Sequence, residues 1–150
     1  MLDLAAGRGR HSRLLLELGY RVTAVDRDAS GLTELPGVEA IAADLEDGSP
    51  WPLPDRHFAG IVVVNYLYRP ILPRIAASLA PGGVLIYETF GAGQERYGKP
   101  RNPDHLLRPG ELLAFSDREG LTVRAYACGQ TGGGEPSVRQ SVVAARHAAR

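Results

Sequence analysis

The sequence predicts a doubly wound α/β domain, in which helices cover both faces of a mostly parallel sheet. Short apolar segments alternate with segments of helical periodicity, and a glycine-rich loop joins the first apolar segment to the first helix. Two segments of strand character then close the chain. At 150 residues and 44% hydrophobic content, the chain is long enough for one core and too short for two ordinary domains. We therefore expect a single domain over residues 1–150.

Seven segments are expected to be strands: residues 2–4, 22–26, 38–43, 58–64, 84–87, 121–128 and 138–145. The segment 58–64 is apolar on both faces and rich in β-branched residues, which is typical of a central parallel strand. The last two segments flank a glycine cluster and are expected to form an antiparallel hairpin. In the first of these, apolar and polar residues alternate, which predicts one inward-facing set: Leu121, Val123, Ala125 and Ala127.

Helical spacing predicts four helices between these strands. Asp28 or Ser30 is expected to cap the short second helix, and Pro109 to occupy the first position of the fourth. The apolar stripes of the other helices are Leu14, Leu15 and Leu18 in the first, residues 71–79 in the third, and Leu112, Leu113 and Phe115 in the fourth. Residues 80–83 are expected to end the third helix, and residues 49–54 and 91–109 to form loops.

Charge and cysteine content limit the partners. The 17 basic residues balance the 17 acidic ones, so no net field favours nucleic acid or an anionic membrane, and neither is expected as a partner. The single cysteine, Cys128, cannot form an intrachain disulfide and fits a reducing, cytoplasmic compartment. No apolar run approaches the roughly 18 residues of a membrane span. Because no histidine and carboxylate cluster has metal-ligand spacing, no metal is expected.

Acidic residues stand at the carboxyl ends of the first three predicted strands. Asp3, Asp26 and Asp44 are therefore expected to converge on one crevice, because ligands of such sheets bind at that edge. Gly7 and Gly9 would let the backbone approach a ligand closely. Asp26 can accept hydrogen bonds from ribose hydroxyls, and Asp44 from the amine of an adenine on which Leu45 packs. The set predicts a nucleoside site.

Two ligands share an adenosine half, a dinucleotide and S-adenosylmethionine. A pyrophosphate is anionic, whereas a sulfonium amino acid carries cationic groups. An ionised Asp3 beside the glycine loop would repel pyrophosphate and hold the amino group of the sulfonium ligand, directly or through water. Residues 7–12 also lack the third small residue of a strict G-x-G-x-x-G/A pattern. The carboxylate therefore favours the sulfonium, with an NAD(P)-dependent oxidoreductase as an alternative.

The chain resembles the class I S-adenosylmethionine-dependent methyltransferases over nearly its whole length. Residues 3–9 are similar to the family's D-x-x-x-G-x-G motif, residues 25–26 to the acidic end of its second strand, residues 43–45 to its adenine-side motif, and residues 79–83 to its L-x-P-G-G. Residues 9–12 and 109–112 are similar to the tellurite-resistance-type branch. The resemblance implies a Rossmann-like seven-stranded sheet with an antiparallel last strand, S-adenosylmethionine as cofactor, and a small-molecule methyl acceptor.

Residues expected at the ligand follow from these motifs. Those expected to bind the cofactor are Asp3, Ala5, Gly7, Gly9, Asp26, Arg27, Asp44, Leu45 and Asn65. Those considered for the acceptor side are Tyr66, Tyr68, Arg69, Glu88, Tyr97 and His105, each of which can instead serve packing or loop structure. Methyl transfer from a sulfonium mainly requires alignment and exclusion of water, so no catalytic residue is assigned.

Only two residues precede the first motif, whereas members of the family usually carry several tens. The expectation at this point is an N-terminally truncated domain without its lid, or a minimal member whose lid comes from a partner such as a second copy. A homo-oligomer is therefore possible. A noncatalytic or degenerate cofactor-binding domain is the alternative of a different class.

Overall fold

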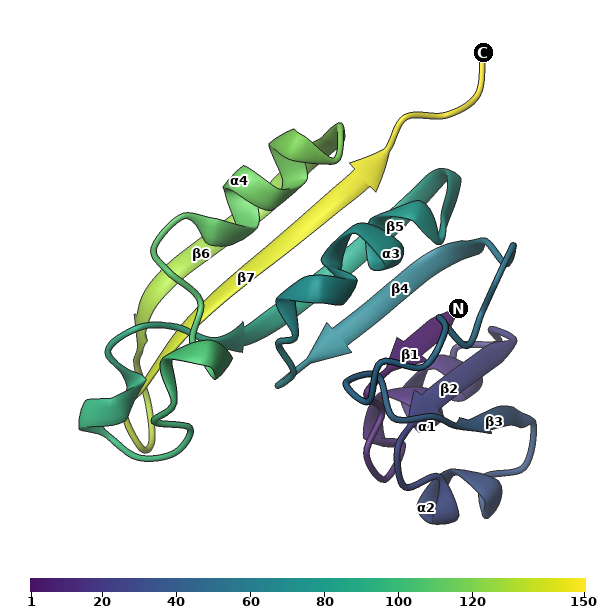
Figure 1. Cartoon of the computed structure of the whole chain (residues 1–150), viewed down its shortest axis with the longest axis horizontal. Helices are drawn as coiled ribbons and strands as arrows, with labels where there is room; N and C mark the ends of the chain where they lie inside the picture. The colour runs from purple at the N-terminus through teal and green to yellow at the C-terminus, as the bar shows by residue number, and fades with distance from the viewer.

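The sheet has seven strands and one antiparallel member. The computed structural model describes residues 1–150, with strands β1 (Leu2–Leu4), β2 (Val22–Asp26), β3 (Val38–Ala42), β4 (Phe58–Val64), β5 (Leu79–Phe90), β6 (Leu121–Thr131) and β7 (Ser137–Arg146). Their order is β3-β2-β1-β4-β5-β7-β6 (Figure 1). β1 to β5 pair in parallel, whereas β7 runs antiparallel to both of its neighbours, β5 and the edge strand β6. The predicted fold class is therefore confirmed.

The helices are short and cover the two faces unequally. They are α1 (Arg10–Glu17), α2 (Ser30–Thr33), α3 (Leu72–Ala77) and α4 (Glu111–Arg118), with 3-10 turns at Arg69–Ile71, Gln94–Arg96 and Pro103–His105. The larger core, of 20 buried residues, packs the sheet against α3 and α4 through side chains such as Ile75 and Phe115. On the other face, Leu15 of α1 packs with Val22 and Val62. None of these helices has the length and hydropathy needed to cross a membrane.

Strand order determines where a ligand can bind. From β1 the chain continues to β2 and β3 on one side of β1, and it then crosses to the other side of β1 to form β4 and β5. The carboxyl ends of β1 and β4 therefore border the crevice at which open α/β sheets bind ligands. Asp26 ends β2, Ala43 follows β3 and Asn65 follows β4, so all three lie at this edge.

The third helix ends earlier than predicted. It stops at Ala77, and Leu79 already pairs with Phe58 as the first residue of β5. Gly60 then pairs with Val84, so residues 80–83 form an irregularity within the strand. A Cβ at Gly83 would lie 2.8 Å from the Ala80 carbonyl oxygen and 2.9 Å from that of Phe58. Gly83 is needed for this close backbone approach, and not only for ending a helix.

A bulge reverses the predicted side-chain alternation of β6. Val123 pairs with Ala144 and Ala125 with Val143, so Arg124 is an extra residue in the ladder. The extra residue shifts the alternation by one position. Tyr126, expected outside, consequently packs against the main core, whereas Ala125 and Ala127 are exposed. Along this edge strand Leu121 is the one buried residue.

Two other helical predictions need correction. Gly110, with φ at 75°, takes the N-cap of α4, so Pro109 lies outside the helix, and Leu113 is exposed. In α1 the stripe is only partly buried: Leu14 and Leu18 are 52% and 63% exposed. These two leucines border an open groove of about 550 Å³ that includes Ile86 of β5. No helix covers this part of the sheet in residues 1–150.

Candidate functional site

One cavity of about 840 Å³ lies at the carboxyl edge of the sheet. It extends from the ends of β1 to β5 to the loop that follows β5. Its lining comprises Ala5, Asp26, Arg27, Ala43, Asp44, Leu45, Glu46, Asn65, Tyr66, Leu67, Thr89, Phe90, Lys99, Pro100, Arg101, Asn102 and His105. Six predicted cofactor residues and two acceptor-side candidates, Tyr66 and His105, are therefore brought together. A cavity of this size is in the range that encloses a small ligand.

Asp26 is held rigidly at the end of β2. One carboxylate oxygen accepts a hydrogen bond from the Gly7 backbone N–H at 2.9 Å, and the other accepts from the Asp28 N–H at 3.0 Å. A carboxylate has about four lone-pair sites, so two such bonds leave sites free for a ligand. Asp26 thus fixes the glycine loop and presents acceptors to the cavity.

Asp3 does not line the cavity. It is 2% exposed, and the Ser12 hydroxyl donates to its carboxylate at 2.6 Å, which ties β1 to the start of α1. Burial raises the pKa of Asp3 above its ordinary value of 3.8, although Ser12 opposes the rise. The sequence predicts that Asp3 holds the amino group of the ligand either directly or through water. Because Asp3 is buried and does not line the cavity, its position does not support direct contact. Asp3 supports the loop from behind.

The pH dependence of stability gives a test of this burial. Because the pKa of Asp3 is raised in the folded state, the folded chain holds this proton more tightly than the unfolded chain does. The contribution of Asp3 to the free energy of unfolding therefore increases as pH falls through the folded-state pKa, and it stops changing below the unfolded-state pKa. We expect Asp3→Asn to be relatively more stable at pH 7 and to lose that advantage on acidification. Urea unfolding of both proteins across this pH range measures the difference, and parallel profiles would contradict it.

Gly7 and Gly9 of the loop both have positive φ values but differ in how closely other residues surround them. Both have positive φ, 58° at Gly7 and 82° at Gly9. A Cβ on Gly9 would lie 2.5 Å from Leu35 Cδ1, whereas a Cβ on Gly7 would meet nothing within 4 Å. Gly9 is therefore required by packing of the loop against the α2 region. Neither residue lines the cavity, which Ala5 enters instead from the same turn, with φ at 54°.

The wall after β3 and β4 is acidic and carries a tyrosine hydroxyl. Asp44, Leu45 and Glu46 form a turn in which Asp44 accepts the Glu46 N–H at 2.9 Å. The Tyr66 hydroxyl is buried without a hydrogen-bond partner in the protein. Burial, reinforced by Glu46 and Asp44, raises the pKa of Tyr66 well above its ordinary range. This hydroxyl remains protonated at neutral pH, and the Glu46 carboxylate is its interacting neighbour.

Four of the acceptor-side candidates lie outside the cavity lining. Tyr68 precedes the 3-10 turn at Arg69, and Tyr97 donates from its hydroxyl to Gln130 at 3.1 Å. Glu88 accepts from Arg139 at 2.6 Å. The guanidinium of Arg69 donates to the Glu111 carboxylate and to two backbone carbonyls. Tyr97, Glu88 and Arg69 have partners within the protein, and none of the four side chains lines the cavity.

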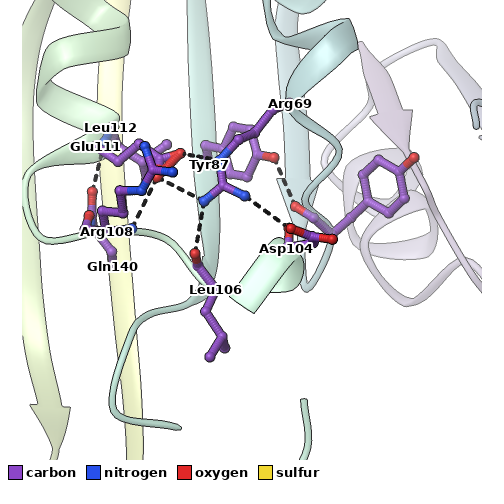
Figure 2. Close-up of polar contacts among 9 residues, drawn as sticks. Arg69, Tyr87, Asp104, Leu106, Arg108, Glu111, Leu112 and Gln140 are labelled. Carbon is purple, nitrogen blue, oxygen red and sulfur yellow. Dashed lines mark hydrogen bonds and ion pairs between the residues drawn. The ribbon is translucent and has the colours of Figure 1, made fainter. Parts of the chain in front are cut away.

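Arg69 and Glu111 attach the long loop to the domain, as Figure 2 shows. Arg69 donates twice to the Glu111 carboxylate at 2.9 Å and also to the carbonyls of Asp104 and Leu106. Glu111 additionally accepts the Arg108 N–H at 3.0 Å. Burial alone would raise the pKa of Glu111, but Arg69 and the Arg108 N–H together lower it. The network fixes the loop whose inner side forms part of the cavity wall.

A cationic segment of this loop was missed by the sequence reasoning. Lys99 and Arg101 line the cavity, and neither forms an ion pair within the chain. Lys99 is the single lysine of the protein, which is the one signal that could have drawn attention to it. Thr89 and Phe90, at the end of β5, were missed as well. No group of three or more His, Cys, Asp or Glu side chains is arranged to hold a metal ion.

Comparisons with known sequences find relatives of one kind. No protein-family model matches the chain. It is 36% identical over 121 residues to a trans-aconitate 2-methyltransferase of Methylobacterium nodulans, which is 75% of this chain and 42% of the relative. It is 34% identical over 120 residues to the enzyme of the same name from Acidovorax ebreus, with the same shares covered. The chain thus spans 42% of the length of these relatives.

Solved structures agree in fold. A Methanosarcina mazei S-adenosylmethionine-dependent methyltransferase superposes with a TM-score of 0.75 at 18% identity, covering 99% of this chain and 92% of that one. A Burkholderia thailandensis 1,6-didemethyltoxoflavin-N1-methyltransferase, solved with S-adenosylhomocysteine, gives 0.72 at 21% identity, covering 97% and 70%. At such identities the likeness shows the fold, and the relatives above add a sequence relationship. The chain is thus similar in fold to S-adenosylmethionine-dependent methyltransferases and, over 75% of its length, similar in sequence to trans-aconitate 2-methyltransferases.

Proposed function

We propose that this domain binds S-adenosylmethionine and transfers its methyl group to a small-molecule acceptor. The observation that carries the proposal is the meeting of Asp26, Asp44 and Asn65 at the wall of one cavity at the carboxyl edge of the sheet. The carboxylates and the amide of these three residues are polar groups that fit an adenosine. The names of the sequence relatives and of the structural neighbours support the same function.

The residues have separable roles in this proposal. When bound, S-adenosylmethionine would supply an activated methyl group: the acceptor would bond to the methyl carbon as the carbon–sulfur bond breaks, and S-adenosylhomocysteine would be the leaving group. Asp26 accepts from the ribose hydroxyls, because its other two hydrogen bonds hold it in place. Asp44 accepts from the adenine amine while Leu45 packs on the ring. Arg27 and Ala5 complete the cofactor side, and Asp3, Gly7 and Gly9 support the loop from outside the cavity wall.

The acidic wall disfavours the alternative dinucleotide. Asp26, Asp44 and Glu46 line the cavity beyond β2 and β3, where each carboxylate would repel a pyrophosphate, whereas Lys99 and Arg101 lie on the loop after β5. Asp3 does not line the cavity. An NAD(P)-dependent oxidoreductase is therefore the less favoured function.

The acceptor side favours an anion. Lys99 and Arg101 bring two unpaired cationic side chains to the wall, and His105 lies beside them in the lining. A carboxylate acceptor is already ionised at neutral pH, so its methylation needs no general base, and none is assigned. The trans-aconitate named for the relatives is a small carboxylate of this kind. We therefore propose a carboxylate-bearing acceptor.

Other features of the protein remain proposals. The lone cysteine fits a cytoplasmic location, and the similarity of residues 9–12 and 109–112 supports the tellurite-resistance-type branch. A homo-oligomer stays a prediction. Direct roles of Tyr68, Arg69, Glu88 and Tyr97 toward an acceptor would require these side chains to leave their present positions.

Methyl transfer can be tested with labelled cofactor. Incubation with methyl-labelled S-adenosylmethionine and trans-aconitate is expected to yield a labelled methyl ester, whereas an amine of similar size gives no product. Binding of S-adenosylhomocysteine without transfer to any acceptor of either class would identify a noncatalytic binding domain. Absence of that binding would overturn the cofactor assignment itself.

The cationic segment provides a test of acceptor charge. Lys99→Ala and Arg101→Ala are each expected to raise the KM for trans-aconitate by about fivefold, because each removes one charge-assisted contact. Neither side chain makes a hydrogen bond in the protein, so the fold and the affinity for S-adenosylhomocysteine should be unchanged. Arg124→Ala is the matched control, since Arg124 is an exposed cation on the edge strand β6. An unchanged KM in both cavity variants would contradict an anionic acceptor.

A further inference from the structure

Arg139 of β7 reaches across β5 to the end of β4. It lies opposite Phe90 in the strand ladder, and its guanidinium stands 4.5 Å from the centre of that ring. It donates to the Glu88 carboxylate at 2.6 Å and, through Nη2, to Oδ1 of Asn65. The Arg139 side chain is 18% exposed. A side chain from a strand two places away in the sheet thus fixes the residue that follows β4.

Asn65 is held in an unusual conformation at this point. Its φ is 56°, in the left-handed region, and its backbone N–H donates to the Glu88 carbonyl at 2.9 Å. Asn65 lines the main cavity and also the groove beside α1, so it stands between the two. Backbone and side chain are therefore both fixed, the first by β5 and the second by β7.

The contact with Arg139 decides which way the amide faces. A guanidinium has only donors, so the atom of Asn65 that faces it must be the carbonyl oxygen. The amide NH2 is then directed away from Arg139 and makes no hydrogen bond within the protein. A cation on the amide oxygen also polarises the group and strengthens its N–H donors. Asn65 consequently has a free, oriented donor at the boundary between the cavity and the groove.

Strand order indicates which part of the cofactor this donor meets. Asp44 follows β3 and Asp26 ends β2, so in the proposed function the adenine and ribose lie over those strands. The next two strands are β1 and β4, and the amino-acid end of the cofactor follows in that direction. The hydrogen-bond acceptor at that end is its carboxylate.

We propose that Arg139 is a positioning residue, which orients the Asn65 amide so that its NH2 group donates to the carboxylate of the bound cofactor. This inference rests on the proposed function for the identity of the ligand. Glu88 holds Arg139 in place by accepting from its Nε. Glu88 thereby acts on the ligand only indirectly, through Arg139 and then Asn65.

A double-mutant cycle with S-adenosylhomocysteine tests this by calorimetry. Asn65→Ala is expected to weaken binding about tenfold and Arg139→Ala about fivefold, while the double variant is no weaker than Asn65→Ala alone, because Arg139 acts through Asn65. Arg139→Lys should recover part of the loss, since it keeps one charged donor. 5′-Methylthioadenosine, which lacks the amino-acid end, should bind all of these proteins equally.

A spectroscopic measurement gives the second readout. Asn65 and Asn102 are the two asparagines of the chain, so the NH2 resonances of Asn65 can be assigned by substitution of either. S-adenosylhomocysteine should shift these resonances in the wild type, and 5′-methylthioadenosine should not. Arg139→Ala should reduce the shift without changing the fold.

Arg146 offers a control within the same strand. Arg146 lies at the other end of β7 and donates to the Ala76 carbonyl, so Arg146→Ala removes an arginine of the same strand without touching Asn65. It should leave both affinities unchanged. Additive losses in the cycle, or equal losses for both ligands, would overturn the positioning role while the wild type still binds S-adenosylhomocysteine. Failure of the wild type to bind would instead overturn the proposed function.

Discussion

Asp26→Ala is expected to weaken binding of S-adenosylhomocysteine by about 1.5 to 3 kcal/mol, or roughly 10- to 150-fold. The variant removes a charged acceptor from the cavity wall and also releases the Gly7 and Asp28 N–H groups that the carboxylate holds. The free loop then has to be ordered by the ligand, which adds to the lost hydrogen bonds. Calorimetric titration of both proteins measures the difference.

Two controls separate the parts of this effect. Asp47→Ala removes a carboxylate that accepts the Ser49 N–H outside the cavity lining, so it should leave the affinity unchanged. Asp26→Asn keeps one acceptor oxygen for the backbone and should fall between wild type and Asp26→Ala. An unchanged affinity in Asp26→Ala would exclude its role at the ribose.

Glu111→Ala is expected to lower the free energy of unfolding by about 2 to 4 kcal/mol, because removing one partner leaves a partly buried charge uncompensated. Arg69 would keep only the carbonyls of Asp104 and Leu106 (Figure 2). The Glu111 side chain is 16% exposed, so solvent replaces little of what is lost. Urea unfolding measures the change, and limited proteolysis should show faster cleavage within residues 91–109.

The pH dependence of the same carboxylate has the opposite sign to that of Asp3. The pKa of Glu111 is lowered in the folded state, so its contribution is present above the unfolded value of about 4.5 and is lost as pH falls through the folded value. Glu119→Ala is the matched control, because Glu119 pairs at 3.4 Å with the exposed Arg118. That variant should change stability by less than about 1 kcal/mol. Equal losses in the two variants would contradict the special role of Glu111.

The meeting of Asp26 and Asp44 at one edge of the sheet was predictable because it follows from strand order. Asp26 and Asp44 stand directly at strand ends, and in a parallel sheet those ends share one edge whatever the loops do. Asp3 has the same local pattern, but its side chain faces α1 and binds Ser12. A pattern of strand ends locates a residue at the edge and does not say which way its side chain points.

The acceptor side depends on contacts between distant residues. Arg69 had the features of a binding residue, yet Glu111, 42 positions later, takes its guanidinium. Lys99 and Arg101 line the cavity because the Arg69–Glu111 ion pair holds their loop against the edge of the sheet. A contact between such distant residues leaves no periodic pattern in the local sequence. The same holds for Arg139 and Asn65, which are 74 positions apart.

Bulges account for the errors in β5 and β6. Alternation and helical spacing assume an uninterrupted register, and one extra residue at Arg124 moves Tyr126 to the inner side. Gly82 and Gly83 resembled a helix stop because the close backbone contact of Gly83 with Phe58 is nonlocal. These departures lie away from the cavity edge, so the predicted position of the cofactor residues was unaffected.

The most direct test of the account is calorimetric titration of the chain with S-adenosylhomocysteine, set beside an equal titration with NADH. We expect saturable one-to-one binding of S-adenosylhomocysteine that Asp26→Ala weakens by the amount given above, and no measurable heat with NADH. Binding of NADH in preference to S-adenosylhomocysteine, or binding of neither, would contradict the cofactor assignment on which the proposed methyl transfer depends.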